Sequence, residues 1–378
     1  MMGPYILVFF ISFLIMVIAE YFLKKNKFLG CIYYITALIL LAVFAAIRDF
    51  TVGTDIYVYG NNIFYDASHF SYSVALMNNE RWGEPGYVFF NYLVGRFTTN
   101  AHIFYGCLAF ITTFIAYKFF RKHSNELYVP FAMLLFLFFL YPLNFNILRQ
   151  GLAISIMAFT FDYFSKGKPI KALMTGAIAF LIHDSSIIIT MVYCLLFFLV
   201  ELFRRKGFFS IKKATLFIIG GSLIFPLIFM QLPTSIFSSI DDKYYYLEQT
   251  VSFSNISYAR LFIFAVPILY FWKELVSFFK RFDGRDSLTF AYFVTLVNIA
   301  FSAYSGSMYV LFGRGSFYFY IPFIYLICKL ISVELKQSKR IIHYVFFVIY
   351  TILSFLFLLY IGNYADIFPF RISSSFSQ

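Results

Sequence analysis

Side chains capable of acid–base or phosphate chemistry stand at the ends of long apolar runs in this 378-residue sequence. Arg149 and Gln150 separate two such runs, and His183 and Asp184 fall between two others. A charged side chain in a hydrocarbon setting is costly unless it is paired or faces a polar cavity. These positions therefore indicate either protein partners or a bound ligand.

The composition predicts the elements that must position them. Hydrophobic residues make up 61% of the chain and charged residues 13%, whereas soluble domains carry about 25% charged residues. Because a spanning helix needs roughly 20 apolar residues, we expect an all-α polytopic membrane protein, a single domain over residues 1–378 with about 12 transmembrane helices and both ends outside. The predicted spans are 4–23, 28–47, 101–120, 129–145, 147–164, 171–183, 185–203, 214–232, 259–276, 287–304, 314–332 and 343–361.

The basic residues agree with this topology. The predicted inner loops contain 22 of the 30 Lys and Arg residues, and 16 of those 22 are lysine. Such an excess is typical of cytoplasmic loops, so the net charge of +12 requires no nucleic acid. Seven of the eight outer basic residues are arginine, whose planar fork binds phosphate and carboxylate in a bidentate way.

Two outer loops are long. The first, from Arg48 to about residue 100, contains an apolar segment at 87–97 that is too short to span, and we expect a re-entrant or interfacial helix there. The second, from 233 to about 258, contains Asp241, Asp242 and three successive tyrosines. Those tyrosines suit either sugar stacking or an interfacial aromatic belt.

The outer loops and the outer ends of the predicted spans collect the candidate site residues. They are Arg48, Asp49, Asp55, Glu84, Arg149, Gln150, His183, Arg260, Arg314 and Tyr318. Arginines stabilise charge on a departing phosphate, and a carboxylate or histidine deprotonates an attacking hydroxyl. The alternatives are interfacial anchoring for the arginines, pairing of Asp49 with Arg48, and a helix-end role for His183. No histidine pair has the i, i+4 spacing of a metal site, so we expect no metal and no cofactor.

Five segments carry a resemblance to a known family: Arg48-x6-Asp55 with Gly53-Thr54, Glu84-Pro85-Gly86-Tyr87, Leu148-Arg149-Gln150-x2-Ala153, Phe180-Leu181-Ile182-His183-x-Ser185, and Arg314 with Tyr318. In order and spacing they resemble the EpsG-like branch of bacterial Wzy-type polysaccharide polymerases, from about residue 30 to 330.

The resemblance implies a glycosyltransferase of the bacterial inner membrane with its active site facing the periplasm or outside. Such proteins build O-antigen, capsule or exopolysaccharide by joining oligosaccharide repeats linked to undecaprenyl pyrophosphate, and their fold is similar to the GT-C class. The implied partners are the lipid-linked donor and acceptor, membrane lipid and a chain-length regulator protein.

The same resemblance implies roles for single residues. Arg149 and Arg314 become pyrophosphate ligands with Arg48 in support, and Gln150, Arg260 and Tyr318 line the substrate site. Asp55, Glu84 and His183 remain alternative bases. A flippase or transporter with a similar number of spans is the main alternative, although such proteins place polar groups near the bilayer midplane. An O-antigen ligase, which uses the same donor, is the other.

Overall fold

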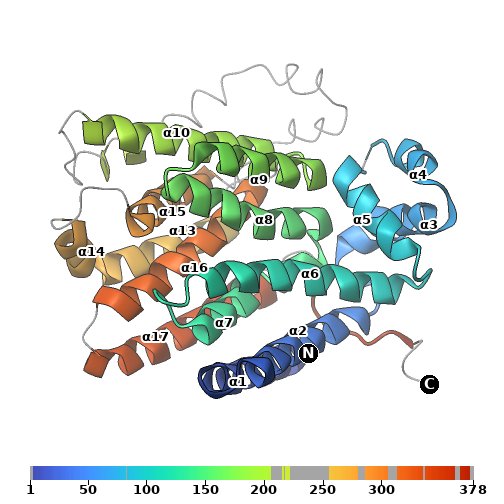
Figure 1. The fold of residues 1–378 in the computed structure, drawn as a ribbon, viewed down its shortest axis with the longest axis horizontal. Helices are drawn as coiled ribbons and strands as arrows, with labels where there is room; N and C mark the ends of the chain where they lie inside the picture. The colour runs from blue at the N-terminus through green and yellow to red at the C-terminus, as the bar shows by residue number, and fades with distance from the viewer. Residues whose placement is uncertain are drawn as a thin grey trace. The chain divides into compact units, whose positions relative to one another are not determined.

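The computed structural model describes residues 3–81, 83–205, 215–216, 218–221, 255–279, 286–304, 313–334, 337–361 and 367–374. Within these ranges the chain is mostly helical and forms no strand, only an isolated bridge between Arg48 and Ile372 (Figure 1). The helical class predicted from composition is therefore confirmed. The predicted span at 214–232 and the second long outer loop fall almost wholly outside the described residues.

The chain divides into two compact units. Unit 1 comprises residues 1–156, 177–186 and 341–378, and unit 2 comprises 157–176 and 187–340. Two helices, α8 (Leu148–Ser165) and α9 (Pro169–Ile182), pass from one unit to the other. The sequence carries no linker that would mark this division, and the prediction of one domain stays a prediction.

Unit 1 is built on helices that pack along their lengths. They are α1 (Gly3–Lys25), α2 (Lys27–Ala46), α6 (Ala101–Lys122), α7 (Val129–Phe139) and most of α17 (Gln337–Phe355), which the π-helix η7 (Leu356–Ile361) continues. α1 lies against α2 and α7, and α2 lies against α6 (Figure 1). Every residue of α7 is buried, because this wholly apolar segment lies inside the bundle.

The starts and ends of the long helices follow from local chemistry. The side chain of Asn26 accepts hydrogen bonds from the backbone N–H groups of Phe28 and Leu29 at the start of α2. Asn100 caps α6 in the same way, by accepting from His102 N at 2.9 Å. These caps satisfy donors that a helix start leaves without partners. Lysine and arginine end α1 and α6, where cations offset the negative end of the helix dipole.

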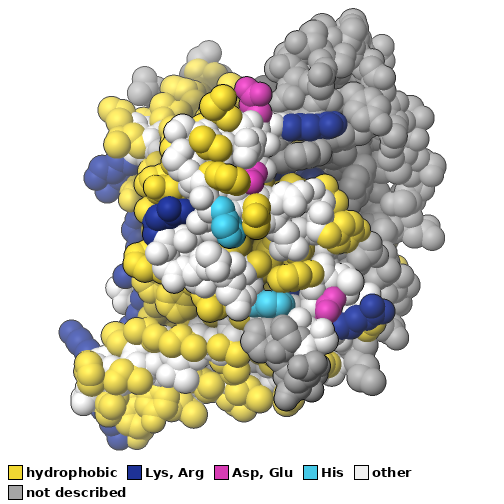
Figure 2. Space-filling model, turned by 90° about the vertical axis from the view of Figure 1, so that its right-hand side faces the viewer, with side chains coloured by type: hydrophobic (Ala, Val, Ile, Leu, Met, Phe, Trp, Pro, Cys, Tyr) yellow, Lys and Arg dark blue, Asp and Glu magenta, His cyan; other side chains and the backbone are white. Residues whose placement is uncertain are grey.

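The predicted first outer loop folds into short helices. After α2 come the π-helix η1 (Ile56–Gly60), α3 (Asn61–His69), α4 (Tyr72–Asn78) and α5 (Pro85–Gly95). The helix α5 coincides with the short apolar segment at 87–97, so the predicted short helix is confirmed. On the side of the molecule where α3, α4 and α5 lie in Figure 1, histidine and acidic side chains stand among hydrophobic ones (Figure 2).

The C-terminal segment 367–374 lies against the start of this loop. Asp49 N donates to the carbonyl of Arg371 at 2.8 Å, and Ser373 N donates to the carbonyl of Ile47 at 2.9 Å. Tyr5 of α1, which is fully buried, donates to the carbonyl of Ile367 at 2.7 Å. The last described residues are thus held by backbone hydrogen bonds on both sides of Arg48.

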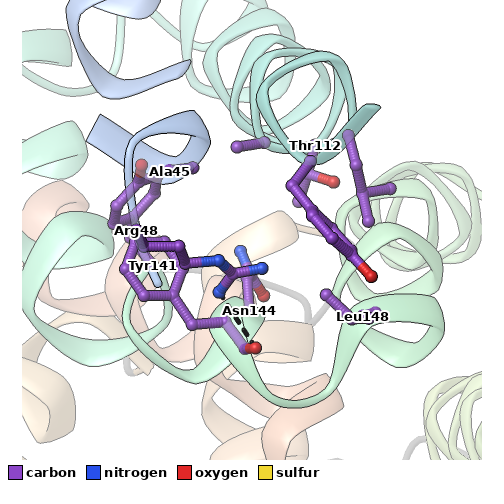
Figure 3. Close-up of a pocket in the computed structure, with 10 residues that line it drawn as sticks. Ala45, Arg48, Thr112, Tyr141, Asn144 and Leu148 are labelled. Atoms are coloured by element: carbon purple, nitrogen blue, oxygen red, sulfur yellow. Dashed lines mark hydrogen bonds between the residues drawn. The ribbon is translucent and has the colours of Figure 1, made fainter. Parts of the chain in front are cut away.

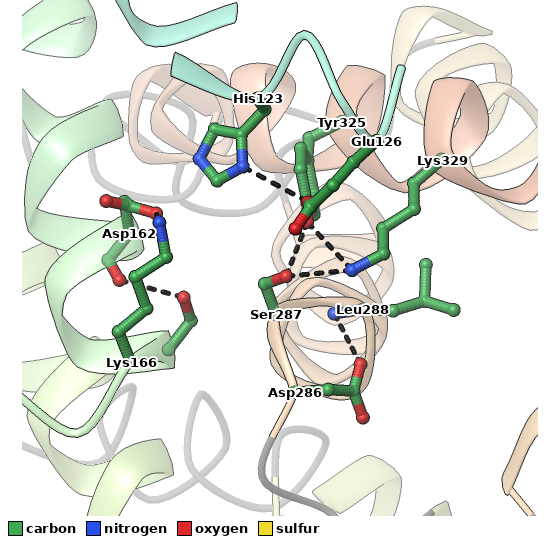
Figure 4. Close-up of polar contacts among 10 residues, drawn as sticks. His123, Glu126, Asp162, Lys166, Asp286, Ser287, Leu288, Tyr325 and Lys329 are labelled. Carbon is green, nitrogen blue, oxygen red and sulfur yellow. Dashed lines mark hydrogen bonds and ion pairs between the residues drawn. The ribbon is translucent and has the colours of Figure 1, made fainter. Parts of the chain in front are cut away.

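In unit 2 the buried helices are α15 (Ser287–Tyr304) and α16 (Tyr320–Lys329), which contact each other. The carboxylate of Asp286 caps α15 by accepting from Leu288 N and Thr289 N (Figure 4). Lys329 is 9% exposed and donates to the hydroxyls of Ser287 at 3.0 Å and Tyr325 at 3.1 Å. Unit 2 also contains α10 (Ser186–Arg205, from residue 187), α13 (Asn255–Tyr270), α14 (Trp272–Phe279), η5 (Ser316–Phe319) and η6 (Leu330–Glu334).

Several helices have the length and apolarity of membrane spans. Within the described residues four qualify: α1, α2, α6 and the helix over 339–358. The pair α13 and α14 adds a fifth if it is counted as one span bent by 60°. In α1 the exposed large side chains Leu7, Ile11, Leu14 and Ile18 follow one helical face. Such exposed apolar stripes are typical of contact with lipid, and the chain is a membrane protein.

Candidate functional site

The carboxylate of Glu84 joins three segments of unit 1. Glu84 directly precedes α5 and is 7% exposed. Arg149 Nη1, from the first turn of α8, donates to Glu84 Oε2 at 2.6 Å. His183 Nδ1, just after α9, lies 2.9 Å from Glu84 Oε1. A buried carboxylate, a guanidinium and an imidazole thus form one hydrogen-bonded group, and all three were candidates from the sequence.

Glycine and proline explain how α5 brings Glu84 to this place. Pro85 occupies the first turn of the helix, where its missing N–H is no loss. A Cβ atom on Gly86 would lie 2.8 Å from the carbonyl oxygen of Leu181 in α9. Only glycine allows so close an approach of backbone to backbone. The Glu84-Pro85-Gly86 sequence therefore sets the start of α5 against the end of α9, next to His183.

The electrostatic surroundings keep Glu84 ionised. Burial alone would raise the pKa of this carboxyl, but the Arg149 guanidinium and then His183 outweigh burial and lower the pKa to about 2. An ionised carboxylate only accepts hydrogen bonds, so the His183 Nδ1 atom facing it carries the proton. In the neutral ring Nε2 is then the basic nitrogen. Glu84 thus selects the tautomer of His183.

Asp55 lies in the same unit and is linked to Arg149 through Tyr59. Tyr59 donates its hydroxyl hydrogen bond to Asp55 Oδ2, and the Arg149 guanidinium lies over the Tyr59 ring, 4.3 Å from its centre. Asn146 Oδ1 accepts from Asp55 N at 3.0 Å and from the Thr54 hydroxyl. Burial and then Asp55 raise the pKa of Tyr59 well above its ordinary value, which keeps the phenol protonated as a donor.

Gly53 allows the loop that carries Asp55 to reach this position. Its φ of +94° is a left-handed conformation, and a Cβ atom there would lie 2.2 Å from the carbonyl oxygen of Phe145. Residues 53–55 therefore lie directly on the segment that precedes α8. The Gly53-Thr54-Asp55 sequence and the Asn146–Arg149 segment form one local structure.

The remaining candidates occupy other places. Arg48 is 2% exposed and donates to the carbonyl of Phe145 at 3.0 Å. Gln150 follows Arg149 in α8 and is 2% exposed. In unit 2, Arg260 Nη1 donates to the carbonyl of Gly313 at 3.2 Å, next to Arg314, and Tyr193 donates to the carbonyl of Tyr318 at 3.1 Å. Seven candidates, Asp49 included, lie in unit 1 and three lie in unit 2.

The sequence interpretation missed Tyr59 and left Asn146 and Asp184 without a role. Tyr59 stands four residues after Asp55, which places the two on one helical face, and this spacing was the available signal. Asn146 begins the segment that ends in Arg149, but its contacts with residues 54 and 55 depend on the fold. Asp184 Oδ1 lies 3.7 Å from His183 Nδ1.

Among the described residues, Glu84, His183 and Asp184 have donor atoms within 4.8 Å of one another, close enough for a cation. Their chemistry fits a metal poorly in this arrangement. The Glu84 oxygens already accept from Arg149 and His183, and a cation would have to displace the Nδ1 proton beside a guanidinium. The arrangement suits proton transfer by His183 better than metal binding.

Membrane-length helices, together with a buried carboxylate–imidazole–guanidinium group, define a membrane protein with a polar site. The sequence matches the EpsG family over residues 31–372, and the chain belongs to that family. It is accordingly a membrane protein of polysaccharide biosynthesis, in a family that is in general glycosyltransferase-like. Searches of curated proteins and of solved structures found no match.

Proposed function

We propose that the protein is a Wzy-type polymerase that transfers a growing glycan from undecaprenyl pyrophosphate to a hydroxyl of another lipid-linked repeat unit. The transfer takes place on the outer face of the bacterial inner membrane, in a GT-C-like fold of about 12 spans, with no cofactor and no metal. The observation that carries the proposal is His183, whose Nδ1 proton faces an ionised Glu84 beside Arg149.

His183 acts as the general base. Its Nε2 atom takes the proton from the acceptor hydroxyl as the hydroxyl oxygen attacks the anomeric carbon of the donor sugar. The bond from that carbon to the pyrophosphate oxygen breaks, and its electron pair leaves with the pyrophosphate. Glu84 holds the imidazole in the basic tautomer and stabilises the imidazolium that forms. Glu84 orients His183 as the aspartate orients the histidine in a Ser-His-Asp triad, but no serine nucleophile takes part.

The other residues of unit 1 have supporting roles. Arg149 keeps the Glu84 carboxylate ionised. Tyr59 contacts both Arg149 and Asp55, and we assign Asp55 a positioning role. Gln150 follows Arg149 in the same helix. Arg260, Arg314 and Tyr318 of unit 2 remain proposed ligands of the glycan or the pyrophosphate. A chain-length regulator is a proposed partner.

The test compares variants in cells that lack the native copy of the protein. His183→Ala removes the base, so we expect single lipid-linked repeats and no long glycan, at unchanged protein level in the membrane. His69→Gln is the matched control, because His69 is exposed and bonds only locally to Ser68 and Tyr65. Long glycan made by His183→Ala would refute the assigned base.

Reconstitution separates the polymerase from the alternatives. Purified protein in vesicles with lipid-linked repeats should lengthen the glycan when donor and acceptor are both repeat units. Movement of the lipid-linked repeat across the bilayer without lengthening would instead identify a flippase. Transfer only to a lipid A-core acceptor would identify a ligase.

A further inference from the structure

The helix α5 carries polar side chains on its buried face and apolar side chains on its exposed face. Tyr87 and Asn91 are fully buried and stand one turn apart on the same side of the helix. On the opposite side Phe89 and Leu93 are 49% and 45% exposed, and Phe97, just beyond the helix end, is 90% exposed. We call these three residues the α5 stripe. A helix that borders water has the reverse arrangement, so the stripe indicates apolar surroundings.

The neighbouring helix α3 has the ordinary arrangement. It packs against α5, and its buried residues are all apolar. Its exposed face carries Asn62, Tyr65 and His69, which stand at helical spacing on one side. The inversion is therefore a property of α5 and not of the whole predicted first outer loop. The exposed face of α3 suits water, whereas that of α5 suits lipid.

Close contacts between the two helices fix the direction in which the α5 stripe points. A Cβ atom on Gly95 would lie 2.8 Å from the Cα atom of Ser68 in α3, so the backbones touch there. Arg96 Nη2 donates to the carbonyls of Ala67 and Ser68 at 2.8 and 2.9 Å. These contacts hold the buried face of α5 against the protein. The stripe therefore stays on the outside.

The helix α5 also packs against the beginning of α6, which has the length and apolarity of a membrane span. The ring centres of Phe90 and Phe104 lie 5.9 Å apart. One side of α6 faces the interior, where it borders a small space beside Arg48 with Tyr105, Leu108 and Thr112 (Figure 3). The opposite side of α6 carries exposed or half-buried side chains at Ile103, Cys107, Phe110 and Phe114. An apolar side of a spanning helix contacts lipid, and α5 lies at the level where this side of α6 begins.

We propose that α5 lies at the surface of the bilayer with Phe89, Leu93 and Phe97 against the acyl chains of membrane lipid. The inverted arrangement of α5 and its place beside the first turn of α6 both support lipid as the occupant. Aromatic side chains are enriched at this depth of a membrane, and helices that lie in the interface bury an apolar face among lipid chains.

The same placement gives the depth of the candidate site. Glu84 directly precedes α5, and its carboxylate lies 2.9 Å from His183 Nδ1. On the other side of this group, Leu181 of α9 approaches the backbone of Gly86 and is itself 48% exposed. Apolar surface thus flanks Glu84 and His183 on both helices. The group lies at the depth of the lipid headgroups instead of in the water above them.

This assignment deepens the proposed function and rests on it for the identity of the substrate. A lipid-linked substrate keeps its hydrocarbon chain in the bilayer, so its phosphate and first sugar lie at headgroup depth. A base at the same depth is reached from the side, through the lipid, without withdrawal of the chain from the membrane. The α5 stripe is then part of the surface along which donor and acceptor approach His183.

The test measures the surroundings of single tryptophans in the full-length protein, reconstituted in phosphatidylcholine vesicles. The two native tryptophans, Trp82 and Trp272, are first replaced by phenylalanine. Phe89→Trp then reports on the α5 stripe, and Tyr65→Trp is the matched control on the exposed face of α3. We expect lipid with brominated acyl chains to quench the fluorescence of Phe89→Trp at least about threefold more strongly than that of Tyr65→Trp. Acrylamide in the water should quench the two in the reverse order.

The possible outcomes separate lipid from the other occupants of the stripe. Phe97→Trp repeats the measurement if Phe89→Trp does not fold. Equal quenching of the α5 and α3 positions by acrylamide would place the stripe in water and overturn the proposal. Quenching of the α5 position by neither reagent would show a protein partner there, such as a second copy of the chain, and would overturn it as well. The measurement uses ordinary phospholipid and no glycan, so it and the glycan assay with His183→Ala can fail independently.

Discussion

Replacing Glu84 by glutamine tests the central ion pair of unit 1. Glu84 and Arg149 are each 7% exposed, and Nη1 and Oε2 lie 2.6 Å apart. The pKa of Glu84 falls from 4.5 to about 2, which corresponds to about 3 kcal/mol of interaction in favour of the ionised form. Breaking a buried pair from one side costs about 3–5 kcal/mol. We therefore expect Glu84→Gln to lower the free energy of unfolding by about 3 kcal/mol.

A double-mutant cycle separates the pair from other effects of each substitution. Arg149→Met alone should cost a similar amount, because it leaves the Glu84 carboxylate buried beside His183. The double variant removes both charges, so its loss should fall short of the sum of the single losses by about 2–3 kcal/mol. The measurement is unfolding of the purified protein by a denaturing detergent, followed by circular dichroism.

Glu20→Gln is the matched control for this cycle. Glu20 also pairs with an arginine, Arg121 at 2.9 Å, but the two side chains are 19% and 31% exposed. A pair with that exposure contributes about 0–1 kcal/mol. If Glu84→Gln is as mild as Glu20→Gln, or if the two single losses add within about 0.5 kcal/mol, the buried pair does not stabilise unit 1 as argued. Glu84→Gln should also abolish long glycan. A carboxylate only accepts hydrogen bonds and so fixes the Nδ1–H tautomer of His183, whereas an amide can also donate and does not fix it.

Two further predictions follow from unit 1. The folded-state pKa of Glu84, about 2, lies below its ordinary value of 4.5, so its contribution is fully present above about pH 4.5 and is lost as the pH falls toward 2. Detergent unfolding across this range should show a steeper loss of stability in the native protein than in Glu84→Gln, and equal slopes would contradict the assignment. Gly86→Ala places a Cβ atom 2.8 Å from the Leu181 carbonyl oxygen and should cost about 1–3 kcal/mol by overpacking and shorten the glycan. Gly3→Ala, with no heavy atom within 4 Å of its Cβ, should change neither, and a tolerated Gly86→Ala would show that α5 and α9 can separate without loss.

Helix positions could be predicted from the sequence because apolar runs and their caps are local. The span predicted at 101–120 is α6, Ala101–Lys122, and the short apolar segment at 87–97 is α5. The span predicted at 259–276 is bent, with α13 ending at Tyr270 and α14 beginning at Trp272. Pro267 lies inside α13, and a proline removes a helical hydrogen bond and kinks the chain. The break itself lies at residue 271, beyond this proline.

The site could be predicted only as a set of residue types. Glu84, Arg149 and His183 were each candidates, but their pairing depends on contacts across 65 and 99 positions of the chain. Sequence alone gives no such distance. The structure provides Arg149 with a protein carboxylate, whereas the sequence suggested a phosphate as its partner. The contact of Arg48 with the carbonyl of Phe145, across 97 positions of the chain, likewise becomes visible only in three dimensions.

The hydrogen bonds of the C-terminal segment have a consequence for biosynthesis. Residues on both sides of Arg48 bond to Arg371 and Ser373, so the segment that follows α2 acquires these neighbours only after residue 373 has been made. A protein shortened before residue 367 would carry α1 and α2 without the backbone hydrogen bonds that flank Arg48.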